Sequence, residues 1–150
     1  MTEYRHIMAI THYRQMNELV HDYFDKTQAK ENLPPLDMDW PTYIEMERNG
    51  NVVVVGAYDN ERLVGFVMYV VAPNLHHRTL KCAACDIIGV RPEYRNQHIA
   101  RHLMAVAEKR MRDAGVHYIS HQFRTDYETE PLFGKLGYDL IEQCYRKRIA

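Results

Sequence analysis

The stretch that decides the fold runs from Ile88 to Met104 and reads I-G-V-R-P-E-Y-R-N-Q-H-I-A-R-H-L-M. Its first residues complete a nearly apolar run, Cys82 to Val90, in which Asp86 is the one charged residue. Such a run predicts a strand that is buried on both faces. A short basic turn follows and opens into a helix predicted over 97–114. The helix is predicted from apolar residues at near 3.6-residue spacing, namely Ile99, Leu103, Val106, Ala107, Met111 and Ala114.

The start of this helix has the features of a phosphate site. The first N–H groups of a helix have no partner within the helix and carry a partial positive charge, so they bind anions. Arg91, Arg95 and Arg101 are expected to cluster around this helix start, and three arginines there indicate a polyphosphate ligand. The sequence contains neither the glycine-rich lysine loop of nucleotide triphosphatases nor the G-x-G-x-x-G turn of dinucleotide-binding proteins, so neither class is favoured.

Around this stretch, the chain alternates strands and helices. Strands are predicted over 4–10, 51–57, 63–71, 116–123, 138–141 and 143–148, and helices over 15–30, from Asp39 or Thr42 to about Gly50, and over 130–136. One strand–helix–strand unit lies inside an otherwise antiparallel run. The sequence therefore predicts an α/β (α+β) fold in one domain, 1–150, with a mixed, mostly antiparallel central sheet and helices on both faces.

Bulk composition is that of an ordinary globular protein. The 150 residues are 46% hydrophobic and 26% charged, with a net charge of −1. A charge so close to zero argues against binding to nucleic acid or to an anionic membrane by the whole surface. Three cysteines and the absence of a long apolar stretch at the N-terminus favour a cytoplasmic protein. Cys82 and Cys85 point to opposite faces of a strand, so no metal site is expected.

Two motifs carry a resemblance to a known family. The run V-R-P-E-Y-R-N-Q-H-I-A from Val90 to Ala100 resembles the acetyl-CoA motif of GNAT acyltransferases, which reads V-x-P-x-Y-R followed after two residues by G-x-G or G-x-A. The run P-L-F-G-K-L-G-Y from Pro131 to Tyr138 resembles the second signature of the family. More narrowly, the chain resembles small GNAT members encoded by bacteriophages. The element order matches the GNAT fold over essentially the whole chain.

The resemblance implies an N-acetyltransferase that uses acetyl-CoA as co-substrate and a primary amine as acceptor. The amine would attack the thioester directly in a ternary complex, and a backbone N–H near Gly89 or Val90 would stabilise the oxyanion. The residues that it implies for the cofactor are Ile88, Gly89, Val90, Arg95, Asn96, Gln97, His98, Ile99, Ala100 and Arg101.

The sequence departs from the family pattern at two positions that matter. His98 stands where the family has a glycine that lets pyrophosphate approach the backbone. Its imidazole would either narrow that approach or hydrogen-bond the phosphate. Phe133 stands where many members have a tyrosine that protonates the leaving thiolate. Tyr127 or Tyr138 could substitute for it, or the thiolate could leave without an acid, since thiols have a pKa of about 8.5.

Two side chains are candidates for the general base. Asp86 lies four residues before the motif valine, where some family members have an acid or a histidine, and burial would raise its pKa towards the working range. His121 is the second candidate, because its strand is expected to run beside the motif strand. A structural role, as an ion-pair or hydrogen-bond partner, is the alternative for each. Asp86, His121 and Tyr138 are therefore the predicted catalytic residues.

The acceptor is predicted only by class. Acidic residues outnumber basic ones between Gln15 and Gly50, the region that borders the acceptor groove in GNAT proteins. A negative rim would attract a cationic amine, either a small molecule or a protein lysine or N-terminus, although charged helix faces more often serve solvation. Family members commonly form homodimers, but the residues themselves do not indicate one. The alternatives are a GNAT fold that has lost catalysis and acts as a binding module, and a nucleic-acid-binding protein that uses the basic residues of the helix predicted over 97–114.

Overall fold

The computed structural model describes residues 1–28, 33–123 and 130–150. The strands are β1 (Thr2–Ile7), β2 (Val52–Asp59), β3 (Arg62–Pro73), β4 (Lys81–Val90) and β5 (Tyr118–Ser120). The helices are α1 (Ala9–Gln28), α2 (Trp40–Arg48), α3 (Ile99–Asp113) and α4 (Glu130–Lys135), with one 3₁₀ turn at Pro92–Tyr94. None of the helices in these ranges is both long and apolar enough to cross a membrane.

The five strands form one sheet in the order β1-β2-β3-β4-β5, which is the order in which they occur in the sequence. Neighbouring strands are antiparallel from β1 to β4, whereas β4 and β5 are parallel. The connection between the two parallel strands contains α3, as a parallel pair requires a crossover. The predicted mixed, mostly antiparallel sheet is therefore confirmed.

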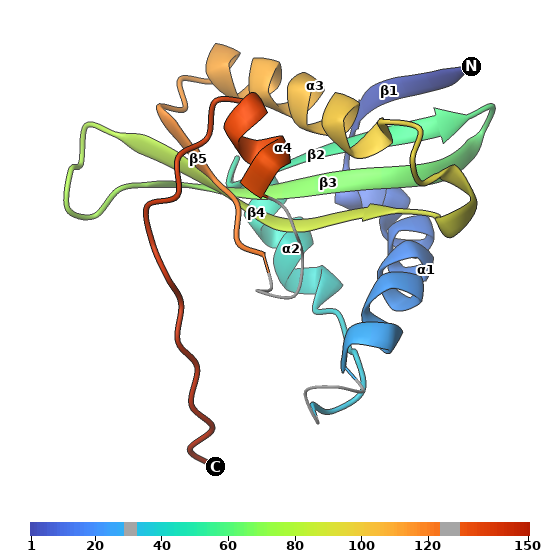
Figure 1. Cartoon of the computed structure of the whole chain (residues 1–150), viewed down its shortest axis with the longest axis horizontal. Coiled ribbons are helices and arrows are strands. Elements are labelled where there is room, and N and C mark those ends of the chain that lie inside the picture. Colours follow the sequence, from blue (N-terminus) through green and yellow to red (C-terminus); the bar gives the residue numbers. More distant parts are fainter. Residues whose placement is uncertain (29–32, 124–129) are drawn as a thin grey trace.

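Helices cover both faces of the sheet (Figure 1). On one face α1 and α2 pack on a core that includes Leu19, Trp40 and Phe66, and on the other α3 packs on a core that includes Val67, Leu103 and Met111. The stripe predicted for α3 is largely the buried one, but Val106 is exposed and Met104 is buried in its place. Side chains alternate between the two cores along β3, because successive residues of a strand point to opposite faces.

The start of α1 differs from the prediction because of a distant side chain. The first strand ends at Ile7 instead of Ile10, and the helix begins at Ala9. Glu47 of α2 accepts hydrogen bonds from the N–H of Ala9 at 2.7 Å and from the N–H of Ile10 at 3.4 Å. These bonds satisfy donors that a helix start leaves without partners. The start of α2 follows local rules, since Asp39 accepts from the N–H of Thr42 at 3.1 Å.

A bulge interrupts β4 at Asp86. Met68 of β3 pairs with Ile87 and the next residue, Tyr69, pairs with Cys85, so Asp86 has no partner on β3. Ala84 and Asp86 are exposed, and the prediction that this strand is buried on both faces is wrong for this segment. The reason is that both residues line a hollow, where no side chains cover the strand.

The C-terminal part of the chain also departs from the prediction. The strand predicted over 116–123 is shortened to β5, and the two strands predicted over 138–141 and 143–148 do not form, since residues 136–150 contain neither helix nor strand. A strand needs a hydrogen-bonded neighbour, and no described strand pairs with this segment. Beyond Tyr138 the larger apolar side chains are accordingly exposed, namely Leu140, Ile141, Tyr145 and Ile149.

Candidate functional site

The turn between β4 and α3 presents a row of backbone donors. Within the described residues, the backbone N–H groups of residues 96–101 donate no hydrogen bond of good geometry. Asn96 and His98 have φ angles of 66° and 60°, in the left-handed region, and His98 is the N-cap residue of α3. Left-handed residues in a turn bring successive N–H groups into a concave arrangement that suits an anion. The backbone of this turn therefore offers donors of the kind that bind an anion, and the phosphate site stays a prediction.

Contacts to the β2–β3 hairpin hold this turn in place. The hydroxyl of Tyr94 donates to Asp59 at 2.7 Å, and Arg62 pairs with Glu93 at 2.9 Å. The N–H of Arg91 donates to the carbonyl of Val64 at 2.8 Å. The turn is thus fixed by side chains and backbone from the neighbouring strands.

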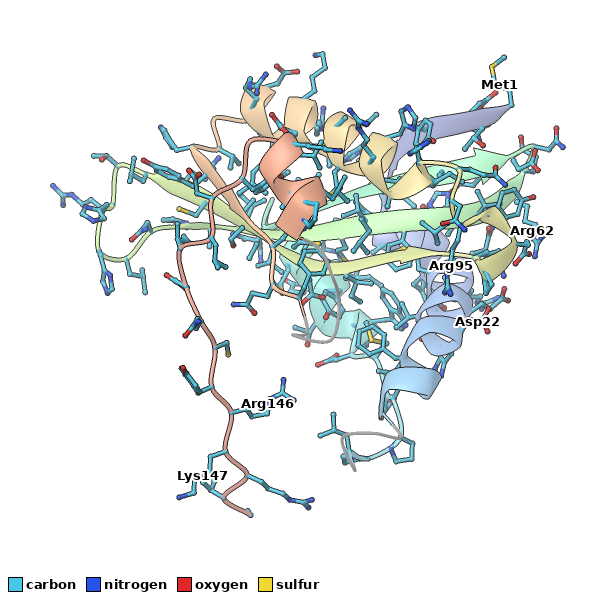
Figure 2. All side chains as sticks on the ribbon, viewed as in Figure 1. Met1, Asp22, Arg62, Arg95, Arg146 and Lys147 are labelled. Carbon is cyan, nitrogen blue, oxygen red and sulfur yellow. The ribbon has the colours of Figure 1, made fainter. Side chains whose placement is uncertain are left out.

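Two of the three predicted arginines remain at the helix start, and the third does not. Arg95 and Arg101 are exposed, and Nε of Arg95 donates to the carbonyl of Val90 at 3.2 Å. Figure 2 shows Arg95 at the turn and Asp22 on α1. The side chain of Arg91 is only 12% exposed and lies 3.6 Å from Glu18 and 3.9 Å from Asp22. Its expected place in a phosphate cluster is wrong, because the α1 carboxylates and the carbonyl of Leu63 bind it instead.

Beyond Ala84 the edge of β4 that faces β5 is open. No described strand pairs with residues 85–90 on that side. Because the N–H of Arg91 points to β3 and successive N–H groups of a strand alternate in direction, those of Val90 and Ile88 point to the open edge. A Cβ built on Gly89 would meet no atom within 4 Å, so there is also free space over one face of the strand at this point. The open edge leads directly to the donors of the turn.

Two hollows meet at Asp86 and Val70. The smaller, of about 210 Å³, lies between β4 and the chain that follows β5, and the larger, of about 380 Å³, lies beside α2. The other residues around the smaller one are Ala84, Cys85, Ser120 and Gln122. Those around the larger one are Asp37, Met38, Asp39, Thr42, Tyr43 and Met46. Asp86 is therefore reachable from both sides of a continuous groove.

The environment of Asp86 differs from the one predicted. The residue is exposed, so the burial expected for it from the sequence is wrong. One of its oxygens, Oδ2, accepts a hydrogen bond from the hydroxyl of Tyr43 at 2.7 Å. Burial and this bond to Asp86 raise the pKa of Tyr43 well above its usual value, so Tyr43 keeps its proton.

His121 lies on the other face of the sheet, in an aromatic cluster. Its ring lies 5.4 Å from Tyr69, 5.9 Å from Phe123, 5.2 Å from Phe133 and 5.3 Å from Tyr138. Nε2 lies 3.0 Å from the hydroxyl of Tyr69, whereas the buried Nδ1 has no partner within the described part of the chain. Burial lowers the pKa of His121 to about 4, so its ring is neutral at physiological pH.

The predicted catalytic residues thus separate into two groups. Tyr138 belongs to the cluster of His121, and burial raises its pKa to about 12. Cys85, next to Asp86 in the sequence, packs on the same side as His121, and burial raises the pKa of its thiol to about 12. Asp86 lines both hollows, whereas His121 lines neither, and the two side chains do not contact each other. Tyr127, the other tyrosine considered, lies outside the described residues.

Sequence reasoning missed Tyr43 and Tyr69, the hydroxyl partners of the two candidate bases. Each lies more than forty positions from its partner, at 43 and 52 residues respectively. In the sequence both tyrosines read as apolar positions of a helix and a strand. No local pattern could have identified their hydroxyls as functional.

Comparison with known proteins places the chain in a family. The sequence profile of the acetyltransferase (GNAT) family matches residues 13–138, and the chain therefore belongs to the GNAT acetyltransferase family. No curated protein matches the chain. The narrower resemblance to bacteriophage-encoded members stays a prediction.

Solved structures of similar fold are distant in sequence. An acetyltransferase of Trypanosoma brucei is 18% identical, with a TM-score of 0.75 over 99% of this chain and 100% of that one. An aminoglycoside acetyltransferase from an uncultured soil metagenomic sample, in complex with sisomicin, is 13% identical, with a TM-score of 0.77 over 99% and 95% of the two chains. The enzyme AAC(6')-Iy, in complex with a bisubstrate analogue of CoA and acetylneamine, is 16% identical, with a TM-score of 0.73 over 99% of both chains. At these identities the likeness shows the fold alone.

The left-handed backbone at position 98 leads to a stability prediction. A residue with a Cβ pays roughly 1–2 kcal/mol in this conformation, which glycine adopts freely. We expect His98→Gly to retain or raise the free energy of unfolding, measured by urea denaturation. The matched control is Gln97→Gly in the same turn, where φ is negative and the added flexibility should lower stability by about 0.5–1 kcal/mol. Equal losses in the two variants would contradict the interpretation.

The low pKa of His121 predicts a stability that depends on pH. The ring is protonated below about pH 4 in the folded state, but already below its ordinary pKa of 6.5 in the unfolded state. Between these values the unfolded chain binds more protons, so stability falls as the pH drops from 6.5 to 4. His121→Phe should make the melting temperature depend less on pH between 6.5 and 4. Substitution of the exposed His76 by Asn should leave that dependence as it is in the wild type. An NMR titration of His121 with a midpoint near 6.5 would exclude the effect.

Proposed function

We propose that this member of the GNAT acetyltransferase family is an N-acetyltransferase that transfers the acetyl group of acetyl-CoA to a primary amine in a ternary complex. The observation that supports it best is a continuous path along β4. The groove at Asp86 meets the open edge of residues 85–90, and that edge leads to the unpaired donors of residues 96–101. A thioester, a pantetheine arm and a pyrophosphate follow one another in the same order in acetyl-CoA.

The residues at the two ends of this path fit the groups that they would bind. The N–H groups of residues 96–101, together with Arg95 and Arg101, provide donors and positive charge for the pyrophosphate. The N–H groups of Ile88 and Val90 would donate to amide carbonyls of the pantetheine arm, or, at Val90, to the carbonyl oxygen of the thioester. When bound, acetyl-CoA supplies an acetyl group activated as a thioester. The alternation of N–H directions favours Val90 over Gly89 for the oxyanion, since Gly89 donates towards β3.

Asp86 is the best candidate for the general base. An amine acceptor is protonated at neutral pH and must lose a proton before it can attack. Asp86 lies where the two hollows meet, and its Oδ1 has no hydrogen-bond partner within the described residues. His121 ranks second because a ring with a pKa of about 4 is a weak base.

Protonation of the leaving thiolate is assigned to Tyr138 or to solvent. Phe133 packs against His121 and Tyr138 and carries no hydroxyl. Tyr138 keeps its proton at physiological pH because its pKa is about 12, so it can donate, although it is a weak acid. A thiol pKa of about 8.5 makes the thiolate a tolerable leaving group without any acid.

The acceptor that the groove favours is a cationic amine. Asp37, Asp39 and Asp86 line the larger hollow, and no Lys or Arg among the described residues lines it. Carboxylates at the mouth of a groove raise the local concentration of cations. A polyamine-like or aminoglycoside-like small molecule fits this charge, and so does a protein lysine or N-terminus. We further propose a cytoplasmic location, which rests on the sequence alone, and a homodimer, which rests on the family resemblance alone.

A catalytically inactive binding module is the second candidate. Two observations favour it: a Cβ and imidazole at position 98, beside the donors of the turn, and Phe133 in place of a tyrosine. Binding of acetyl-CoA without turnover on a panel of amines would support this alternative over the enzyme.

The first test is isothermal titration of the purified protein with acetyl-CoA, with desulfo-CoA as a control. Micromolar binding is expected, and Arg95→Ala should weaken it about ten-fold or more, since a hydrogen bond to a charged group is worth about 1.5–3 kcal/mol. The matched control is Arg112→Ala near the other end of α3, where the arginine pairs with Glu108. No detectable binding to a folded protein would overturn the cofactor site.

Substitution of the candidate base separates binding from chemistry. Asp86→Asn should slow acetyl transfer by about 10²–10⁴-fold, the range for loss of general base catalysis, while the affinity for acetyl-CoA stays within about two-fold. The control is Asp113→Asn at the end of α3, because Asp113 pairs with Lys109 and does not line either hollow. Turnover of the Asp86 variant at the wild-type rate would transfer the role to His121 or to solvent.

A further inference from the structure

A single hydrogen bond joins α2 to β4 across the groove. The hydroxyl of Tyr43 donates to Oδ2 of Asp86 at 2.7 Å, and Tyr43 and Asp86 both line the larger hollow. Within the described residues, Tyr43 is the only side chain that hydrogen-bonds Asp86. One carboxylate oxygen is therefore held, and the other is left for a ligand.

Asp86 depends on such a partner more than an ordinary strand residue does. It is the extra residue of the β4 bulge and has no partner on β3, and it lies beyond the three residues that pair with β5. Its side chain is exposed. An exposed aspartate without cross-strand neighbours samples several rotamers, and bulges commonly redirect a side chain towards a site. The bond to Tyr43 selects one of these rotamers.

Tyr43 is itself held by a chain of contacts that reaches α1. Its ring lies 5.7 Å from that of Trp40, which in turn lies 6.3 Å from Tyr13. Nε1 of Trp40 donates to Asn17 of α1 at 2.9 Å, and Trp40 is buried. The hydroxyl of Tyr43 is thus presented by a fixed framework instead of a free side chain. It remains a donor at any physiological pH because burial raises its pKa.

We propose that Tyr43 is the positioning residue for Asp86: its hydroxyl fixes Oδ2 and leaves Oδ1 to take the proton from the acceptor ammonium. The inference rests on the proposed function and adds to it the part played by α2. In the step that it assists, the N–H bond of the ammonium breaks, the proton forms an O–H bond with Oδ1, and the freed electron pair remains on the nitrogen as the attacking nucleophile. Tyr43 keeps its own proton throughout.

Removal of the hydroxyl should affect the chemical step and spare cofactor binding. Tyr43→Phe keeps the ring against Trp40 and loses only the bond to Oδ2, so kcat should fall about ten-fold while KM for acetyl-CoA stays unchanged. This split between kcat and KM distinguishes a role through Asp86 from a general loss of structure, which would change both values.

The decisive experiment is a double-mutant cycle with Tyr43→Phe, Asp86→Asn and the double variant. If Tyr43 acts through Asp86, its substitution slows the wild type but has no further effect on the Asp86→Asn protein. Tyr13→Phe is the control, since it belongs to the same aromatic chain but does not contact Asp86. Equal slowing by Tyr43→Phe in the wild type and in the Asp86→Asn protein would overturn the positioning role of Tyr43. The proposed acetyltransferase function would still stand after that result.

A second readout needs no turnover. The carboxyl carbon of Asp86, followed by ¹³C NMR at neutral pH, should change its chemical shift in Tyr43→Phe because the bond to Oδ2 is lost, and Tyr13→Phe should leave it unchanged. An unchanged chemical shift in a protein with wild-type melting temperature overturns the positioning role, even if no amine in the panel is acetylated. Absence of both acetyl-CoA binding and turnover, with the chemical shift changed, would instead count against the proposed function.

Discussion

The short pairing between β4 and β5 is the constraint on which the rest of the site depends. Three residue pairs, from Cys82 with Tyr118 to Ala84 with Ser120, hold the parallel strands together. Beyond them β4 continues to Val90 with an edge of backbone groups that no described strand satisfies. Strand edges with unpaired N–H and C=O groups bind extended ligands that supply the missing hydrogen bonds. The bulge at Asp86 lies where this open edge begins, and the donors of the α3 turn lie just beyond its end.

The sheet also separates two chemical environments that share this opening. On the face of α1 and α2, the groove is lined by carboxylates and hydroxyls, and Asp86 is exposed and hydrogen-bonded to Tyr43. On the face of α3, His121 lies among four aromatic rings, and burial lowers its pKa while it raises those of Tyr138 and Cys85. Low polarity favours the neutral form of every group there. The polar face is therefore suited to a charged group, and the aromatic face to an uncharged one.

Residues that act through local rules could be predicted, and those that act through distant partners could not. The stripe of α3, the hairpin of β2 and β3 and the cap at Asp39 all follow from spacing within a few residues. Arg91 has the same chemistry as Arg95 and lies four positions earlier, yet it binds Glu18 and Asp22 of α1 because the strand end directs it there. Glu47 at the start of α1 and Tyr43 at Asp86 act across 38 and 43 positions. The apolar C-terminal residues read as strands, but a strand pattern forms a strand only where a neighbour is present.

The backbone of the α3 turn explains how His98 can replace a glycine. Its φ of 60°, like that of Asn96 at 66°, is the conformation that makes glycine preferable on steric grounds. A side chain persists in such a conformation when its surroundings determine the backbone. Here three contacts attach the 3₁₀ turn before His98 to the β2–β3 hairpin. They join Tyr94 to Asp59, Glu93 to Arg62, and Arg91 to Val64. After His98, the side chain of Ile99 is buried. These contacts determine the directions in which the backbone N–H groups of the turn point. The identity of residue 98 determines only which side chain lies beside those groups. A histidine at position 98 is therefore compatible with this row of donors.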